Sequence, residues 1–211
     1  MQIRTFRFVA IGAATLVSAA YAGGAGKHHF SVTGSYVEGC TCGAPCKCEL
    51  TGVEMGCEGV GAFSFTGGSY DGKNVAGVRA AYATKPGDWV IIYIDAPTAA
   101  KRAAGEALMR AALSGFGKIE AVKNAKVTVG HKGNADWCQV DGGKIMDLKS
   151  QAVLGGDGKT PLTYSNIHDA LHPTVMQGKT TSATFSDGDK KFELKDSNAF
   201  FNHAIKSSGS M

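Results

Sequence analysis

Five of the six cysteines of this 211-residue chain lie between positions 40 and 57, at Cys40, Cys42, Cys46, Cys48 and Cys57. The first four form two Cys-x-Cys pairs separated by three residues, in the stretch CTCGAPCKC. Gly and Pro between the pairs favour a tight loop, so the fold must bring several sulfur atoms onto one short segment. We call these five residues the cysteine cluster. Such a cluster is typical of a soft-metal site or of a set of disulfide bonds.

The N-terminus has the pattern of a secretory signal peptide. Arg4 and Arg7 precede an uncharged apolar run, and the Ala-Tyr-Ala at residues 20–22 fits the cleavage motif. We therefore predict a signal peptide over residues 1–22, a single mature domain over residues 23–211, and a periplasmic or secreted location. The apolar run is shorter than the roughly 20 residues of a membrane helix, so no membrane span is predicted in the mature chain.

The charge balance argues against a nucleic-acid partner. Removal of residues 1–22 takes away two arginines and no acidic residue, so the formal charge falls from +4 to +2. The mature chain has no basic tract that could follow a phosphate backbone. It also has no Ser/His/Asp arrangement, nucleophile elbow or phosphate-binding loop, and on that basis we predict a non-enzymatic protein.

Most of the mature chain has the two-residue periodicity of β-strands. Residues 89–94 are apolar on both faces, which is typical of a buried central strand. Residues 97–113 are instead Ala-rich with a helical period, with Asp95 or Thr98 as N-cap and Gly115 as stop signal. The predicted fold class is α+β: a strand-rich, antiparallel sheet domain with one main Ala-rich helix between two strand-rich halves. The predicted strands are residues 29–37, 60–65, 74–83, 88–94, 121–129, 137–140, 144–148, 151–154, 182–185 and 191–194, the last two forming a hairpin.

Binding of a soft metal ion is our first interpretation of the cysteine cluster. Thiolates prefer Cu(I), Zn or iron–sulfur centres to hard cations. Two Cys-x-Cys pairs could complete a four-sulfur zinc site or hold copper at lower coordination, with Cys57 as a further ligand. The leading hypothesis is therefore an exported protein that captures or delivers Cu(I), with Zn as second choice. Its partner would be a metal-donor or metal-acceptor protein.

Two other interpretations of the cysteines stay open. With Cys138 the six cysteines could form three disulfides in a structural or binding domain without metal, as export favours oxidised pairs. A third interpretation is a thiol–disulfide oxidoreductase that uses Cys42 and Cys46. Their spacing is one residue longer than the thioredoxin motif, and no amphipathic helix follows them.

A pair of histidines could form a separate site. His168 and His172 are four positions apart, so on a helical turn they would share a face and could bind one metal ion. The alternative is that both are ordinary surface or loop histidines.

The stretch around the cluster is similar to a known family. It consists of Glu38, the motif Cys-x-Cys-x3-Cys-x-Cys, then Gly52 and Cys57, and a helix that follows Asp95 and ends in Ser-Gly at residues 114–115. This arrangement resembles the bacterial family catalogued as domain of unknown function 1326. The chain departs from that pattern at Lys47, where the family usually has Pro. The resemblance implies no established activity, but it implies that the five cysteines act as a unit.

Overall fold

The computed structural model of the protein describes residues 27–52 and 56–211. The predicted signal peptide, residues 1–22, lies outside the described residues, so the leader and the periplasmic or secreted location stay predictions. No helix in the described part of the chain is long and apolar enough to cross a membrane.

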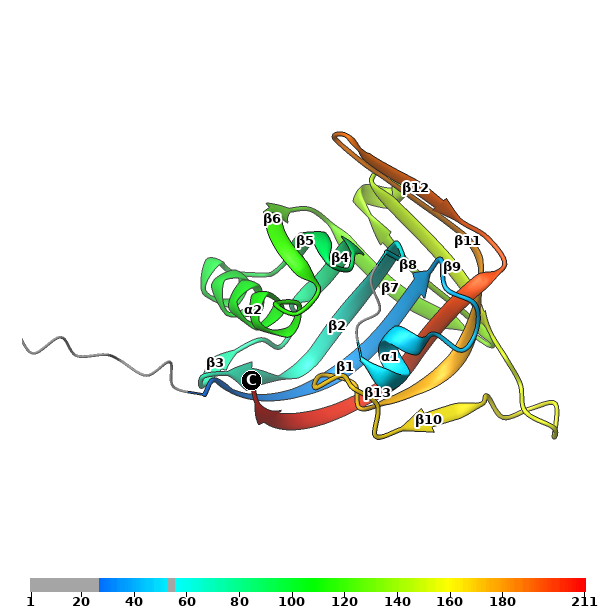
Figure 1. Ribbon diagram of the computed structural model, residues 1–211. Helices are drawn as coiled ribbons and strands as arrows, with labels where there is room; N and C mark the ends of the chain where they lie inside the picture. Colours follow the sequence, from blue (N-terminus) through cyan, green and yellow to red (C-terminus); the bar gives the residue numbers. More distant parts are fainter. Residues whose placement is uncertain (1–26, 53–55) are drawn as a thin grey trace, which may run out of the picture.

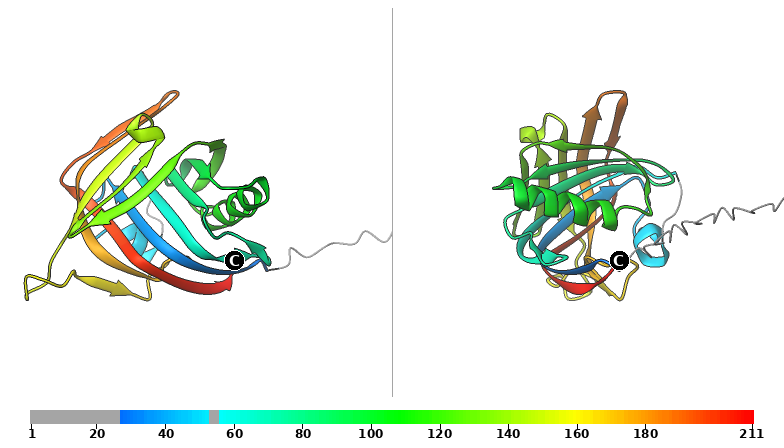
Figure 2. Two further views of the ribbon diagram at one scale, coloured as in Figure 1. Left: turned by 180° about the vertical axis from the view of Figure 1, so that it is seen from behind. Right: turned by 90° about the vertical axis from the view of Figure 1, so that its left-hand side faces the viewer.

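The described residues form one thirteen-stranded sheet, which curls into a half-barrel (Figures 1 and 2). Its strands are β1 (His29–Cys40), β2 (Gly59–Tyr70), β3 (Lys73–Asn74), β4 (Arg79–Lys85), β5 (Asp88–Asp95), β6 (Gly117–Asn124), β7 (Val127–Lys132), β8 (Ala135–Val140), β9 (Met146–Ala152), β10 (Thr163–Ser165), β11 (Thr174–Asp187), β12 (Lys190–Leu194) and β13 (Ser197–Ser210). The order along the sheet is β6-β5-β4-β2-β1-β13-β11-β9-β8-β7, with β3 beside β2, and β10 and β12 beside β11.

The prediction of an α+β domain with a helix between two strand-rich halves is wrong, because the chain is mostly β and the two halves are one sheet. Strand β1 pairs with β13 over its whole length, with His29 opposite Ser210 and Cys40 opposite Asn198. This pairing joins the two ends of the described chain at the middle of the sheet. The main helix, α2 (Ala99–Ala112), connects the parallel neighbours β5 and β6, and every other pairing is antiparallel.

Helix α2 itself lies where the Ala-rich periodicity predicted it. Thr98 is the N-cap, and its hydroxyl accepts a hydrogen bond from the Lys101 backbone N–H at 3.3 Å. On the outer side Glu106 pairs with Arg102 and Arg110, one turn away in each direction. The residues on the side that faces the sheet are buried: Ala104, Gly105, Leu108 and Met109. Ala104 and Gly105 are small, so the helix can approach the sheet closely.

The two faces of the curled sheet form two hydrophobic cores. Strand β5 shows the division, since Ile92 is buried in one core and Ile91 in the other. The predicted burial of this strand on both faces is confirmed, although β5 lies next to the edge strand β6 instead of at the centre of the sheet. The inner core fills the half-barrel, where β7 contacts β2, β4 and β5. The outer core lies beneath α2 and the cysteine cluster.

Candidate functional site

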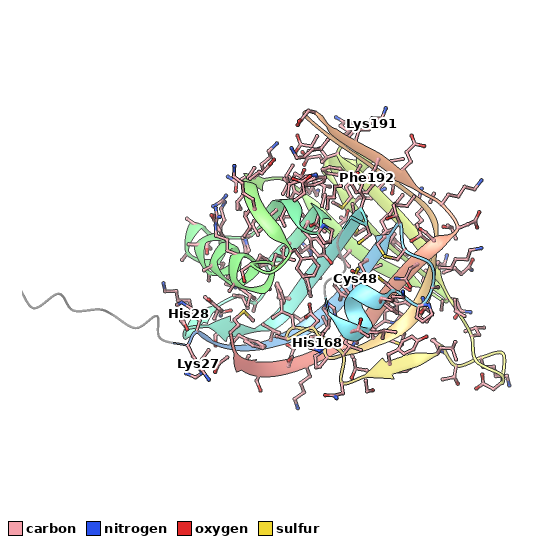
Figure 3. All side chains as sticks on the ribbon, in the orientation of Figure 1. Lys27, His28, Cys48, His168, Lys191 and Phe192 are labelled. Atoms are coloured by element: carbon pink, nitrogen blue, oxygen red, sulfur yellow. The ribbon has the colours of Figure 1, made fainter. Side chains whose placement is uncertain are left out.

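Strand β1 leads directly into the cysteine cluster. Alternate residues of a strand point to the same side, so Tyr36, Glu38 and Cys40 share the face that belongs to the outer core. All three are buried. After Cys40 the chain loops into the short helix α1 (Lys47–Thr51), on which Cys48 lies in front of the sheet (Figures 1 and 3).

The five sulfur atoms of the cluster converge into two overlapping groups of three. The Sγ atoms of Cys40, Cys42 and Cys46 all lie within 4.8 Å of one another, as do those of Cys42, Cys48 and Cys57. Neighbouring sulfurs are 3.5 Å apart in Cys40–Cys46, 3.5 Å in Cys48–Cys57 and 4.0 Å in Cys42–Cys48. We call the first group the inner triad, because Cys40 and Cys46 are buried, and the second the outer triad, because Cys48 and Cys57 are partly exposed. Both triads lie on the side of the sheet that has the outer core. Cys42 belongs to both, so all five residues predicted as metal ligands meet at one place.

The alternative of a disulfide-stabilised domain is wrong for this structure. All six cysteines lie in the part of the chain that the structure describes, and no two of them are bonded. The Sγ atoms of Cys40 and Cys46, like those of Cys48 and Cys57, are 3.5 Å apart, far beyond the roughly 2.05 Å of a disulfide bond. Cys138 could not serve as the sixth partner, because β8 holds it in the inner core while the cluster lies on the opposite face of the sheet.

Contacts within the cluster and burial shift the pKa values of Cys40, Cys42 and Cys57 in different directions. The contact with the Cys40 sulfur has the largest effect on Cys42 and, with smaller effects of Cys46, Cys57 and Cys48, lowers the pKa of Cys42 to about 5, against the opposing effect of partial burial. The same contact raises the pKa of Cys40, and burial raises the pKa of Cys57 to about 12. The lowered pKa therefore falls on Cys42, the residue common to both triads.

Glu38 is a buried carboxyl group beside the cluster. Its Oε2 atom accepts hydrogen bonds from the Tyr36 hydroxyl at 2.6 Å and from the Tyr82 hydroxyl at 3.2 Å. Burial raises the pKa of Glu38 to about 7, although both tyrosine hydroxyls act to lower it. Nearby negative charge on Asp169 and Cys42 raises this pKa further. A carboxyl group in this environment can exchange a proton near neutral pH.

Glu38 and the cluster share one small cavity. The cavity has a volume of about 20 Å³, which is enough for about one water molecule. Glu38, Tyr82 and Phe116 line it together with every cysteine of the cluster except Cys42. The site therefore combines a proton-exchanging carboxyl group, several sulfur ligands and space for about one water molecule.

Asn198 on β13 holds the cysteine loop at three points. Its backbone N–H donates to the carbonyl oxygen of Cys42 at 3.0 Å, and its Oδ1 accepts from the Cys46 backbone N–H at 3.2 Å. Its Nδ2 donates to the Cys40 sulfur at 3.7 Å. Gln177 on β11 fixes the amide by donating to the same Oδ1 at 2.9 Å. Sequence reasoning missed Asn198, because no local pattern marks a residue that lies 158 positions from Cys40.

His168 and His172 do not form the joint site that helical spacing allowed. Their segment has no helix, and His168 is exposed while His172 is buried. The His172 ring stacks on Tyr36 with a centroid distance of 3.8 Å, and its Nε2 lies 3.4 Å from a carboxylate oxygen of Asp169. Burial lowers the pKa of His172. His172 therefore packs as a neutral ring against the tyrosine that binds Glu38.

Comparison with known proteins gives only distant likeness in structure. No family model and no curated protein matches the chain, so its resemblance to domain of unknown function 1326 stays a prediction. Among solved structures, it is similar to the enduracididine biosynthesis enzyme MppR, with a TM-score of 0.45, 13% identity and 88% of each chain covered. It is also similar to acetoacetate decarboxylase from Legionella pneumophila, with a TM-score of 0.45, 11% identity, and 88% of this chain and 87% of that chain covered. A further acetoacetate decarboxylase structure gives a TM-score of 0.42 and 10% identity, over 88% of this chain and 89% of that chain.

The prediction of a non-enzymatic protein for metal capture or delivery disagrees with these neighbours, which are all enzymes, and it is not proposed again. At 10–13% identity and TM-scores of 0.42–0.45, the likeness transfers no activity, substrate or residue role to this chain. The function must therefore be argued from the residues of the chain itself.

Proposed function

We propose that the chain is a metal-dependent hydrolytic enzyme, in which the cysteine cluster is the metal centre and Glu38 transfers protons. The observation that carries the proposal is the shared cavity, where a buried carboxyl group faces sulfur atoms across room for about one water molecule. Catalytic zinc sites use three protein ligands and keep one position for water or substrate, whereas structural zinc sites use four protein ligands. The cavity is lined by Cys40 and Cys46 of the inner triad and by Cys48 and Cys57 of the outer triad.

Zinc is the metal that suits this proposal best. A Zn–S bond of about 2.3 Å places two sulfurs of one tetrahedral ion about 3.8 Å apart. The neighbouring sulfurs of the cluster are 3.5–4.0 Å apart, so the ligands need little movement to bind an ion. Thiolates also suit Cu(I), the first choice from the sequence, and metal analysis of the purified protein separates the two.

Glu38 has the position that a general acid–base group requires. A bound zinc ion would lower the pKa of its water molecule and so supply a nucleophile near neutral pH. The hydroxyls of Tyr36 and Tyr82 fix one carboxylate oxygen of Glu38, which keeps the group oriented beside the cavity. Glu38 would accept a proton from the attacking water and return it to the leaving group, as general acid–base catalysis requires.

Zinc binding is the first test. The full chain, reduced and purified without oxygen, is expected to retain zinc after dialysis. A variant with all five residues of the cluster changed to Ser should retain none while its circular dichroism stays unchanged. Cys138→Ala is the matched control, because Cys138 is buried in the other core and its loss should leave the zinc content as it is.

Elemental analysis of the three proteins decides this prediction. A wild-type protein without zinc would contradict the proposal, and so would zinc retained by the five-serine variant. If the zinc-free wild type reduced insulin disulfides, the oxidoreductase interpretation of Cys42 and Cys46 would replace it.

Glu38→Gln should separate catalysis from metal binding. With p-nitrophenyl acetate as the probe, the zinc-loaded wild type is expected to hydrolyse the ester, and E38Q to do so about 10²- to 10⁴-fold more slowly. The zinc content of E38Q should be unchanged, because the substitution keeps the shape of the side chain and removes only its proton transfer. Glu58→Gln is the control, since Glu58 also lies next to a cysteine of the cluster but does not line the cavity. Equal rates for E38Q and wild type would rule out the assigned role.

A further inference from the structure

We infer that the cysteine cluster binds two metal ions, with the sulfur of Cys42 as a ligand to both. This inference rests on the proposed metal centre and adds the number of ions and their bridging ligand. Its basis is the geometry of the two triads, which meet only at Cys42. Each triad brings three sulfur atoms within 4.8 Å of one another, and each is therefore a possible site for a separate ion.

One ion cannot use all five sulfurs. Zinc in a thiolate site is almost always four-coordinate, so a single ion would leave at least one cysteine of the cluster unbound. The two sulfur contacts of 3.5 Å, Cys40–Cys46 and Cys48–Cys57, fall in different triads. Two ions that share Cys42 would use every sulfur, with three ligands each and one further position for water or substrate.

Charge favours the same arrangement. Five thiolates at a partly buried site repel one another, and burial makes uncompensated charge expensive. Two dications would offset four of the five negative charges, whereas one dication would offset only two. Cys42 lies between the two triads, because it is the residue that both of them contain.

The two ions would differ in their access to solvent. Cys40 and Cys46 of the inner triad are 6% and 1% exposed, whereas Cys48 and Cys57 of the outer triad are both partly exposed. The inner ion would be enclosed, and the outer ion would lie closer to the surface. A chelator should therefore remove the outer ion first.

Cadmium provides the test, because Cd(II) replaces zinc at thiolate sites and its ¹¹³Cd nucleus is visible by NMR. The reduced full chain, loaded with ¹¹³Cd(II), should bind two ions and give two resonances, each split by coupling through the shared sulfur. Cys46→Ser should remove the inner ion and Cys57→Ser the outer one, so each variant should retain a single ion and a single unsplit resonance. Cys138→Ala should retain both ions and the splitting.

The outcomes separate this inference from the proposed function. One cadmium ion per folded wild-type chain would overturn the two-ion centre and leave the metal-dependent enzyme standing. Two bound ions whose ¹¹³Cd resonances show no splitting would overturn the assignment of Cys42 as the bridging ligand. No bound cadmium would overturn both the two-ion centre and the proposed function.

Discussion

Asn198→Ala is expected to lower the free energy of unfolding by about 3 kcal/mol and to weaken zinc binding about 10- to 100-fold. The substitution removes the side-chain contacts that Asn198 makes to Cys40 and Cys46. It leaves the buried backbone N–H of Cys46 without its acceptor, whereas the Gln177 amide keeps the carbonyl oxygens of Gly178 and Ala199. An unsatisfied buried polar group costs more than the hydrogen bond is worth. Without this support the loop would sample arrangements in which the sulfurs no longer converge.

Asn202→Ala is the matched control for this prediction. Asn202 is on the same strand and donates to the carbonyl of Thr174 at 2.7 Å, away from the cysteine loop. Its loss should lower stability in urea denaturation while the zinc affinity, measured by competition with a chromophoric chelator, stays at the wild-type value. Equal zinc affinity in both variants would show that Asn198 stabilises the sheet without positioning the cysteines.

Gly61→Ala is expected to destabilise the protein by about 2–3 kcal/mol and to slow ester hydrolysis at least about tenfold. Gly61 on β2 lies between Glu38 on β1 and Tyr82 on β4. A Cβ atom at this position would lie 2.6 Å from the ring and the hydroxyl oxygen of Tyr82, so the ring would have to move. The Tyr82 hydroxyl would then lose its contacts with Glu38 and Tyr36, and the carboxyl group would lose its orientation.

Two companion variants distinguish displacement of the ring from loss of the hydroxyl. Tyr82→Phe removes the hydroxyl and leaves the ring in place, so it should slow hydrolysis while costing only about 1 kcal/mol of stability. Gly115→Ala should change neither quantity, because nothing lies within 4 Å of its added Cβ. If the Gly61→Ala variant hydrolysed the ester at the wild-type rate with unchanged zinc content, this would contradict the idea that Tyr82 positions Glu38.

Local patterns predicted the elements that depend on neighbours in the sequence. The Ala-rich period and Thr98 predicted α2 to within a few residues, because capping and side-chain periodicity act over one or two turns. The turn after Asp187 predicted the β11–β12 hairpin, in which Asp187 pairs with Lys190. The fold class could not be predicted in this way, because β1 pairs with β13 from the other end of the chain. Such pairing depends on how the whole sheet buries its two faces.

The sequence by itself determined the composition of the cysteine cluster, because residues on one short loop must lie near one another whatever the fold. Only the tertiary structure decided what surrounds the cluster. It brought Tyr82 from β4 to Glu38, brought Asn198 from β13 to the loop, and kept Cys138 on the opposite face of the sheet. The physical reason is that strand register determines which face each side chain occupies, and register is set by pairings between distant segments.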